Sequence, residues 1–349
     1  MKKLIKNIFL LVFICIIVLF FVLKDDFNGI VDLLLSSNKK YILLSILFVF
    51  LSDLLKGYSL YKLVGNKYNF NFFNGLSLML MANFFNGITP FSLGGQPFML
   101  YILKKDSDID YVSGANILFK DFYTYQLGFM LLTIICVICA YLFNLIIISN
   151  TVNKLLWLGI IINIFITLFL LYIPHSKKNE YKIFKLISKV GFIKDKENFY
   201  NKLNTWINNF KAKTKDVIKD KKIIIICSLL NFIKILFVCI STYFCFKAIG
   251  SLVTLNNVIV LTTLVMVMSS FVPIPGASGG MEFSFMQLFS YYVIDSKLGA
   301  SLLMWRAVTY YLPMIFGSIV FLFKRKSNRK WYICVLVFLQ KYMNLMYQV

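Results

Sequence analysis

Apolar runs of about twenty residues recur along the chain, and they limit its fold more than any other feature. A helix of ~20 apolar residues is long enough to cross the hydrocarbon core of a bilayer. Hydrophobic residues make up 59% of the 349 residues, whereas a soluble domain carries about 45–50%. We therefore predict an all-α polytopic protein of the cell membrane, with about 7–8 transmembrane helices besides two broken or re-entrant segments. The predicted spans are 8–23, 41–63, 115–143, 155–173, 223–249 and 298–323, and 331–349 is either a short final span or an interfacial helix.

Two of the apolar segments are interrupted by proline and glycine. Residues 90–98 (P-F-S-L-G-G-Q-P-F) and 275–283 (P-G-A-S-G-G-M-E-F) share the pattern P-x-x-x-G-G-x-[P/E]-F. Proline and glycine break a helix, and broken backbone in a bilayer must face protein or a watery cavity. Two such breaks in the two halves of a chain indicate a transporter binding site, although two unrelated helix kinks would give the same pattern. The candidate lipid-binding residues from these breaks are Asn86, Pro90, Gly94, Gly95, Pro273, Pro275, Gly276, Gly279 and Gly280.

Glu282 and Arg306 are charged residues in apolar surroundings at and after the second break. A charge deep in a bilayer is costly, so each needs a partner, and the two can pair with each other. Such a pair is either a structural bridge or part of a transport site. In the second case Arg306 receives a lipid phosphate through its planar donors, and Glu282 binds a cationic headgroup or a coupling proton. The glycine N–H groups of the breaks would add an anion cradle.

Other charges inside the predicted spans are secondary candidates. Asp53 and Lys56 lie three residues apart, on one face of a helix, so we expect an ion pair with either a structural or a substrate-binding role. Lys120 and Asp121 lie near the start of a span, where snorkelling to the membrane surface is the alternative to a role in the site.

The distribution of lysine predicts the orientation of the chain. The net charge is +22, and the basic residues gather in a few loops, as the positive-inside rule requires of cytoplasmic segments. We expect the amino terminus, the loop 174–222 and the segment 324–330 in the cytoplasm. The first broken segment would then enter from the cytoplasm and the second from outside, as in an inverted repeat. The loop 174–222 is predicted to form basic amphipathic helices on the membrane surface, with nucleic-acid binding as the alternative.

The sequence holds little that supports hydrolytic, redox or metal chemistry. Cys136 and Cys139 have the C-x-x-C spacing of redox and metal sites, but Leu, Ile and Val surround them. Seven cysteines lie in apolar segments, and His175 is the single histidine. A buried free cysteine commonly serves as a small apolar residue. There is no Ser/His/Asp set and no nucleotide-binding fingerprint. We therefore expect no catalytic residues, no metal and no cofactor.

The breaks also resemble a known family. The pattern P-x-P-G-x-x-G-x-x-E at 273–282, the upstream P-x-x-x-G-G-x-P, and W-R-A-V-T-Y-Y-L-P-M-I-F-G at 305–317 are similar to the transmembrane domain of lysylphosphatidylglycerol synthases. The resemblance covers roughly residues 5–325. That domain also occurs alone in flippase-like membrane proteins. It implies one flippase-like domain at 1–330 that moves an anionic or aminoacylated phospholipid, or a polyprenyl-linked lipid, between leaflets.

Two other functions remain open on this resemblance. One is a phosphatidylglycerol lysyltransferase that uses lysyl-tRNA, a function that would require a nucleic-acid partner. In such relatives the transfer chemistry belongs to a cytoplasmic domain after the membrane part, and here the sequence ends about 25 residues after Phe323, so we expect no such domain. The other is an accessory membrane subunit of a separate lipid synthase or glycosyltransferase. In every case membrane lipids are the expected partners.

Overall fold

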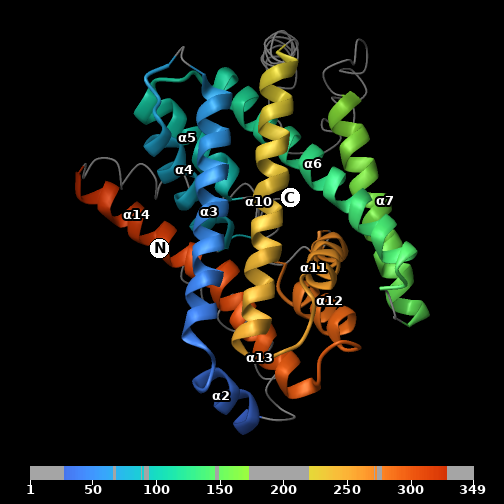
Figure 1. Ribbon diagram of the computed structural model, residues 1–349. Coiled ribbons are helices and arrows are strands. Elements are labelled where there is room, and N and C mark those ends of the chain that lie inside the picture. Colours follow the sequence, from blue (N-terminus) through green and yellow to red (C-terminus); the bar gives the residue numbers. More distant parts are fainter. Residues whose placement is uncertain are drawn as a thin grey trace, which may run out of the picture.

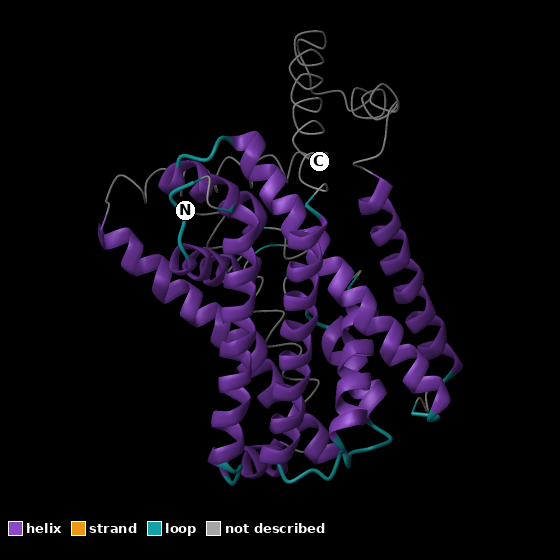
Figure 2. Cartoon of the chain, turned by 45° about the horizontal axis from the view of Figure 1, so that its top comes forward, coloured by secondary structure: helices purple, strands orange, loops and turns teal. Residues whose placement is uncertain are grey.

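The long helices match the spans that the sequence predicts. A computed structural model describes residues 27–65, 68–87, 89, 94–145, 149–172, 220–270, 272 and 277–327, in which helices joined by loops make up the fold (Figures 1 and 2). Within these residues five helical units are long and apolar enough to cross a membrane. They are α3 (Lys39–Val64), α6 (Tyr111–Leu142), α7 (Asn150–Tyr172), α10 (Lys221–Ala248) and the continuous unit Ser296–Lys324. The expected span 8–23, the segment 331–349 and nearly all of the loop 174–222 lie outside the described residues.

The remaining helices are shorter. The first is α2 (Phe27–Leu35), which packs against α13 (Asp295–Arg306). The unit Ser296–Lys324 lies within three successive helical elements, which are α13, a π-helical turn (Ala307–Tyr311) and α14 (Leu312–Ser327). Its continuity explains why the sequence shows a single apolar span there.

Helices α3 and α10 pack along most of their length and form the centre of the bundle (Figure 1). Small and polar side chains allow this close contact: Ser45 Oγ lies 2.8 Å from Ser241 Oγ in a buried position. Gly128 likewise allows α6 to approach α10 closely, because a Cβ at this position would lie 2.6 Å from the carbonyl oxygen of Ser228 on α10. Small residues and interhelical hydrogen bonds hold membrane helices together in the absence of a hydrophobic driving force between them.

Each broken segment folds into a pair of helices that contact each other. The first pair is α4 (Phe72–Gly87) and α5 (Gly95–Ser107), and the second is α11 (Leu255–Ser269) and α12 (Gly280–Phe289). In Figure 1, α4 and α5 lie toward the upper ends of α3 and α10, and α11 and α12 lie toward the lower ends. This placement of the two hairpins at opposite ends is the one that an inverted repeat requires.

Aromatic side chains anchor each hairpin to the bundle. In the first, Phe85 and Phe98 stack with ring centroids 3.9 Å apart, and Phe321 of α14 meets Phe85 edge-on at 5.4 Å. In the second, Phe246 of α10 packs on Phe289 at 4.7 Å. The two hairpins therefore belong to separate buried apolar clusters, so each has its own packing against the long helices.

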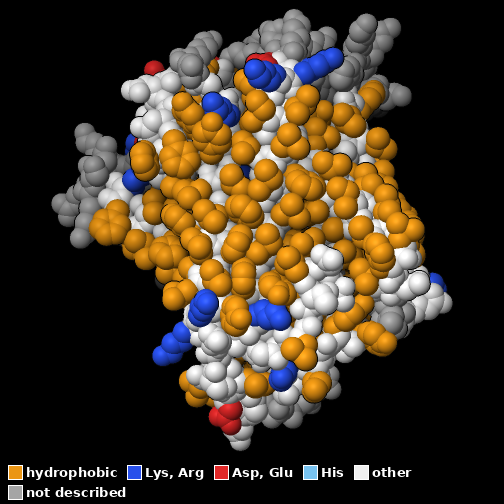
Figure 3. Space-filling model, viewed as in Figure 1, with side chains coloured by type: hydrophobic (Ala, Val, Ile, Leu, Met, Phe, Trp, Pro, Cys, Tyr) orange, Lys and Arg blue, Asp and Glu red, His pale blue; other side chains and the backbone are white. Residues whose placement is uncertain are grey.

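The outer surface carries an apolar belt. Figure 3 shows hydrophobic side chains over the middle of this face, with lysine and arginine side chains above and below. Exposed residues such as Ile138, Ile161 and Phe165 on α6 and α7 belong to this kind of surface. A soluble protein rarely exposes so large an apolar area, whereas lipid tails cover it in a bilayer.

Gly317→Ala is expected to lower the stability of the folded protein. A Cβ at Gly317 would overlap the carbonyl oxygen of Leu80, and this backbone contact joins α14 to α4. Overpacking of this kind costs about 1–3 kcal/mol. The thermal unfolding midpoint of the detergent-solubilised protein measures the loss, with Ser318→Ala on the next residue as the control. Equal midpoints for the two variants would contradict the packing described here.

Candidate functional site

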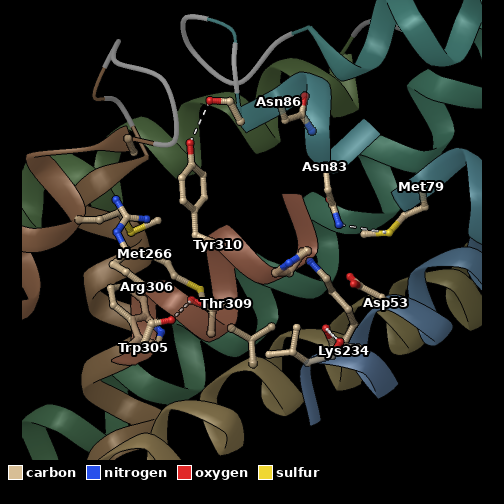
Figure 4. Close-up of a pocket in the computed structure, with 17 residues that line it drawn as sticks. Asp53, Met79, Asn83, Asn86, Lys234, Met266, Trp305, Arg306, Thr309 and Tyr310 are labelled. Carbon is tan, nitrogen blue, oxygen red and sulfur yellow. Dashed lines mark hydrogen bonds between the residues drawn. The ribbon is translucent and has the colours of Figure 1, made fainter. Parts of the chain in front are cut away.

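A cavity of about 310 Å³ lies where the ends of both hairpins approach α13 and α14 (Figure 4). Its lining comes from α3, α4, α10, α11, the second break with the start of α12, and the end of α13 with the π-helical turn and the start of α14. The polar lining residues are Ser52, Asp53, Asn83, Asn86, Lys234, Arg306, Thr309 and Tyr310, and the others are Val49, Met79, Gly87, Val238, Met266, Ala277, Met281, Trp305 and Pro313. A cavity with this many polar groups inside an apolar bundle is suited to a polar or charged ligand.

At the second break, Glu282 joins Arg306 to the start of α12. Glu282 Oε1 accepts from Arg306 Nε at 2.6 Å and lies 2.6 Å from a terminal guanidinium nitrogen. Its other oxygen accepts from the backbone N–H of Gly279 at 2.6 Å. Both residues are buried, and their side chains are 10% exposed for Glu282 and 7% exposed for Arg306. The pairing that the sequence suggested is therefore formed, and it also fixes the backbone of the break.

Gly279 has a φ of +84°, a backbone conformation that glycine adopts at little cost and other residues avoid. This conformation directs the Gly279 N–H toward Glu282, three residues later. The positive φ of Gly279 thus explains why the shared pattern has glycine at this position in the second break.

Different hydrogen bonds hold the backbone of the first break. The backbone N–H of Gly94 donates to Thr89 Oγ1 at 2.9 Å, and that of Gly95 donates to Asn86 Oδ1 at 2.8 Å. A Cβ at Gly95 would lie 2.5 Å from the same Asn86 oxygen. Residues before this break therefore cap the helix that follows it, whereas in the second break the cap comes from inside the following helix.

These hydrogen bonds correct one expectation from the sequence. The glycine N–H groups were expected to form an open anion cradle, but those of Gly94, Gly95 and Gly279 donate to side chains of the protein itself. The reason is that Thr89, Asn86 and Glu282 lie within hydrogen-bonding distance of these otherwise unsatisfied donors at helix starts. Pro90, Pro273, Pro275 and Gly276 lie outside the described residues. Gly280 is a packing position, because a Cβ there would overlap the side chain of Val272.

The π-helical turn contacts the first break as well. Tyr310 donates its hydroxyl hydrogen to the carbonyl oxygen of Gly87, the last residue of α4, at 3.0 Å (Figure 4). Arg306, four residues earlier, holds the second break through Glu282. One short stretch of a long helix therefore contacts both hairpins. Single π-helical turns inside α-helices frequently occur at functional sites.

The prediction that Asp53 and Lys56 form an ion pair is wrong. Lys56 Nζ instead lies 2.7 Å from Asp121 Oδ1 on α6 and 3.3 Å from Asn231 Oδ1 on α10. Although Asp53 and Lys56 share a helix face, the lysine reaches across to the neighbouring helices while Asp53 lines the cavity. Asp121, a secondary candidate, is thus a structural partner of Lys56. Lys120 lies outside the cavity lining and interacts electrostatically with Asp220 at the start of α10.

Sequence reasoning missed several lining residues. Lys234 is the most informative, because a lysine in the middle of a 28-residue apolar helix is by itself a sign of function. No charge marks the other missed residues, which are Asn83, Thr309 and Tyr310. Uncharged polar residues are common in membrane helices and do not by themselves indicate a site. Within the described residues, no group of three or more His, Cys, Asp or Glu side chains is placed to hold a metal ion.

The fold and the site define a multi-pass membrane protein in which two helical hairpins meet a charged cavity. The family described as the lysylphosphatidylglycerol synthase TM region matches residues 7–317, and the chain belongs to this family. A search of curated proteins finds no match.

Proposed function

We propose that this protein is a lipid translocator that carries the headgroup of an anionic or aminoacylated phospholipid, or of a polyprenyl-linked lipid, between the leaflets. The observation that carries the proposal is the shared contact of both hairpins with residues 306–310. Arg306 holds one hairpin through Glu282, and Tyr310 holds the other through Gly87. Broken helices that meet at a central polar site are characteristic of alternating-access transporters.

The size and lining of the cavity support a headgroup as the ligand. A volume of about 310 Å³ lies at the lower end of the ~300–1,000 Å³ that ligand pockets occupy. The polar lining would replace the water around a headgroup, while the acyl chains would stay in the bilayer along the apolar belt. A headgroup that enters from one side would have to loosen one of the two hairpin contacts, and leaving on the other side would require the other contact to open.

The positions of lysine favour a cytoplasmic side at the end where α4 and α5 lie. Lysines at this end include Lys62, Lys104, Lys105, Lys221, Lys222 and Lys324, whereas Lys39, Lys40 and Lys247 lie at the other end. The sequence 173–219, which joins α7 to α10 between their upper ends in Figure 1, adds twelve lysines. Lys324 lies 3.1 Å from Asp106, which connects α14 to the first hairpin at this end. By the positive-inside rule the first hairpin would open to the cytoplasm of the cell membrane and the second to the outside, with the amino terminus cytoplasmic.

The transport proposal predicts that lipid reaches the outer leaflet only with this protein and a lipid source together. The chain would be produced in a host without aminoacylated lipid, alone and beside a soluble lysyl-lipid synthase domain. Total lysylphosphatidylglycerol and the fraction open to an impermeant amine reagent would be measured. We expect lipid from the synthase alone, and outer-leaflet exposure only when the chain is present.

Tyr310→Phe provides a site-specific arm of this experiment. It removes the hydroxyl that bonds to Gly87, and we expect slower exposure of the lipid. Tyr292→Phe is the matched control, because the Tyr292 hydroxyl makes the same kind of bond to the carbonyl oxygen of Leu145 at 2.9 Å, outside the cavity lining. New lipid from the chain alone would make it an enzyme, and unchanged exposure with and without the chain would overturn the transport proposal for this lipid.

A further inference from the structure

The cationic side chains in and around the cavity differ in how they are neutralised. Arg306 directs Nε and a terminal nitrogen at Glu282, and Lys56 is paired with Asp121 at 2.7 Å. Lys234, in contrast, has no ion pair within 4 Å and no hydrogen bond among the described residues. Its ammonium lies 5.2 Å from the centre of the Tyr125 ring. A cation in a membrane helix needs a partner, so a lysine in this position indicates an anionic ligand.

The surroundings of Lys234 suit such a ligand. Lys234 and Asp53 lie on the same side of the cavity in Figure 4, and Asp53 acts on the lysine electrostatically without forming an ion pair within 4 Å. Amide and hydroxyl groups of Asn83, Asn86 and Tyr310 line the same space. An ammonium group has three donors and no fixed plane, which suits one phosphate oxygen at a time, while neutral amides can donate to the others.

We propose that Lys234 binds the phosphate group of the ligand in this cavity. The proposal rests on the proposed function and deepens it, because it assigns the phosphate to Lys234 and leaves Arg306 as the bridge that holds the second break. A phosphate at Arg306 would have to displace Glu282 from two nitrogen contacts, whereas a phosphate at Lys234 displaces no carboxylate. The shared chemistry is a phosphate ester or free phosphate, and the experiment separates these two sources.

The test measures equilibrium binding of radiolabelled dihexanoyl-phosphatidylglycerol to the purified full chain in a non-ionic detergent. Lys234→Gln is expected to weaken binding about tenfold or more, since a charge-assisted hydrogen bond is lost. Lys247→Gln is the matched control, because Lys247 lies on the same helix over a tyrosine ring, 5.5 Å from the centre of Tyr243, and does not line the cavity. We expect its affinity to stay within about twofold of the unmodified chain.

Asp53→Asn gives an independent arm that does not depend on how Lys234→Gln folds. It removes the negative charge that competes with phosphate for Lys234, so we expect tighter binding. Unchanged affinity in Lys234→Gln, an equal loss in Lys247→Gln, or weaker binding in Asp53→Asn would each overturn the proposal. Competition with inorganic phosphate identifies the source: displacement of the lipid by phosphate assigns the site to free phosphate, and displacement only by unlabelled lipid assigns it to a headgroup.

The result is separable from the proposed function. A chain that binds phosphatidylglycerol through Lys234 but exposes no lipid in the outer leaflet would overturn transport and leave the phosphate site standing. A chain that exposes lipid while Lys234→Gln binds as tightly as the unmodified chain would overturn the phosphate site and leave transport standing.

Discussion

Arg306→Ala is expected to abolish lipid movement and to cause a large loss of stability. The substitution leaves the buried carboxylate of Glu282 without its guanidinium partner, although Glu282 still accepts from the Gly279 N–H. Removing one member of a buried pair costs about 3–5 kcal/mol, because an uncompensated charge remains. The second break also loses its ion pair with α13, although Phe285 of α12 still stacks on Trp305. Thermal unfolding in detergent measures the stability, and the outer-leaflet exposure assay measures transport.

The double variant Glu282→Gln/Arg306→Met separates stability from transport. Replacing both charges removes the uncompensated carboxylate, so we expect an unfolding midpoint much closer to that of the unmodified protein. Transport should remain absent, because the bridge between α13 and the break is gone. Glu282→Gln alone should still insert in the membrane and should also fail to transport. Normal transport by Arg306→Ala and Glu282→Gln would refute the role assigned to this pair.

Lys56→Met is expected to have a second large effect, on stability. The side chain of Asp121 is 3% exposed and lies 2.7 Å from the Lys56 ammonium. Without this lysine the carboxylate would be buried among α3, α6 and α10 with no cationic partner in contact, again at a cost of about 3–5 kcal/mol. The unfolding midpoint of the purified protein is the measurement.

The Lys56 prediction has a control that also tests the choice of partner. Lys56→Met/Asp121→Asn should recover most of the lost stability, because both charges are removed. Asp53→Asn should not rescue Lys56→Met, since Asp53 lines the cavity and the ion pair of Lys56 is with Asp121. Rescue by Asp53→Asn instead of Asp121→Asn would mean that the partner is the one expected from helix spacing.

Some features of the fold follow from the sequence because their signals are local. A run of apolar residues the length of a bilayer can bury its backbone polar groups only as a helix, so α3, α6, α7 and α10 could be predicted closely. The prolines and glycines after Ser269 and after Gly87 end a helix for equally local reasons. Glu282 and Arg306 could be paired in advance, because few charges occur in that apolar region and each needs a partner.

The tertiary structure decided which polar groups meet. Lys56 could have paired within its own helix, but Asp121 is in contact with it only because α3 and α6 cross at that point. The glycine N–H groups were expected to face a ligand, yet Asn86 and Glu282 lie close enough to bind them. The sequence alone determined a membrane bundle with two broken segments, since bilayer length and helix breaking are properties of short stretches. Partners and the cavity depend on distances between helices, which no short stretch contains.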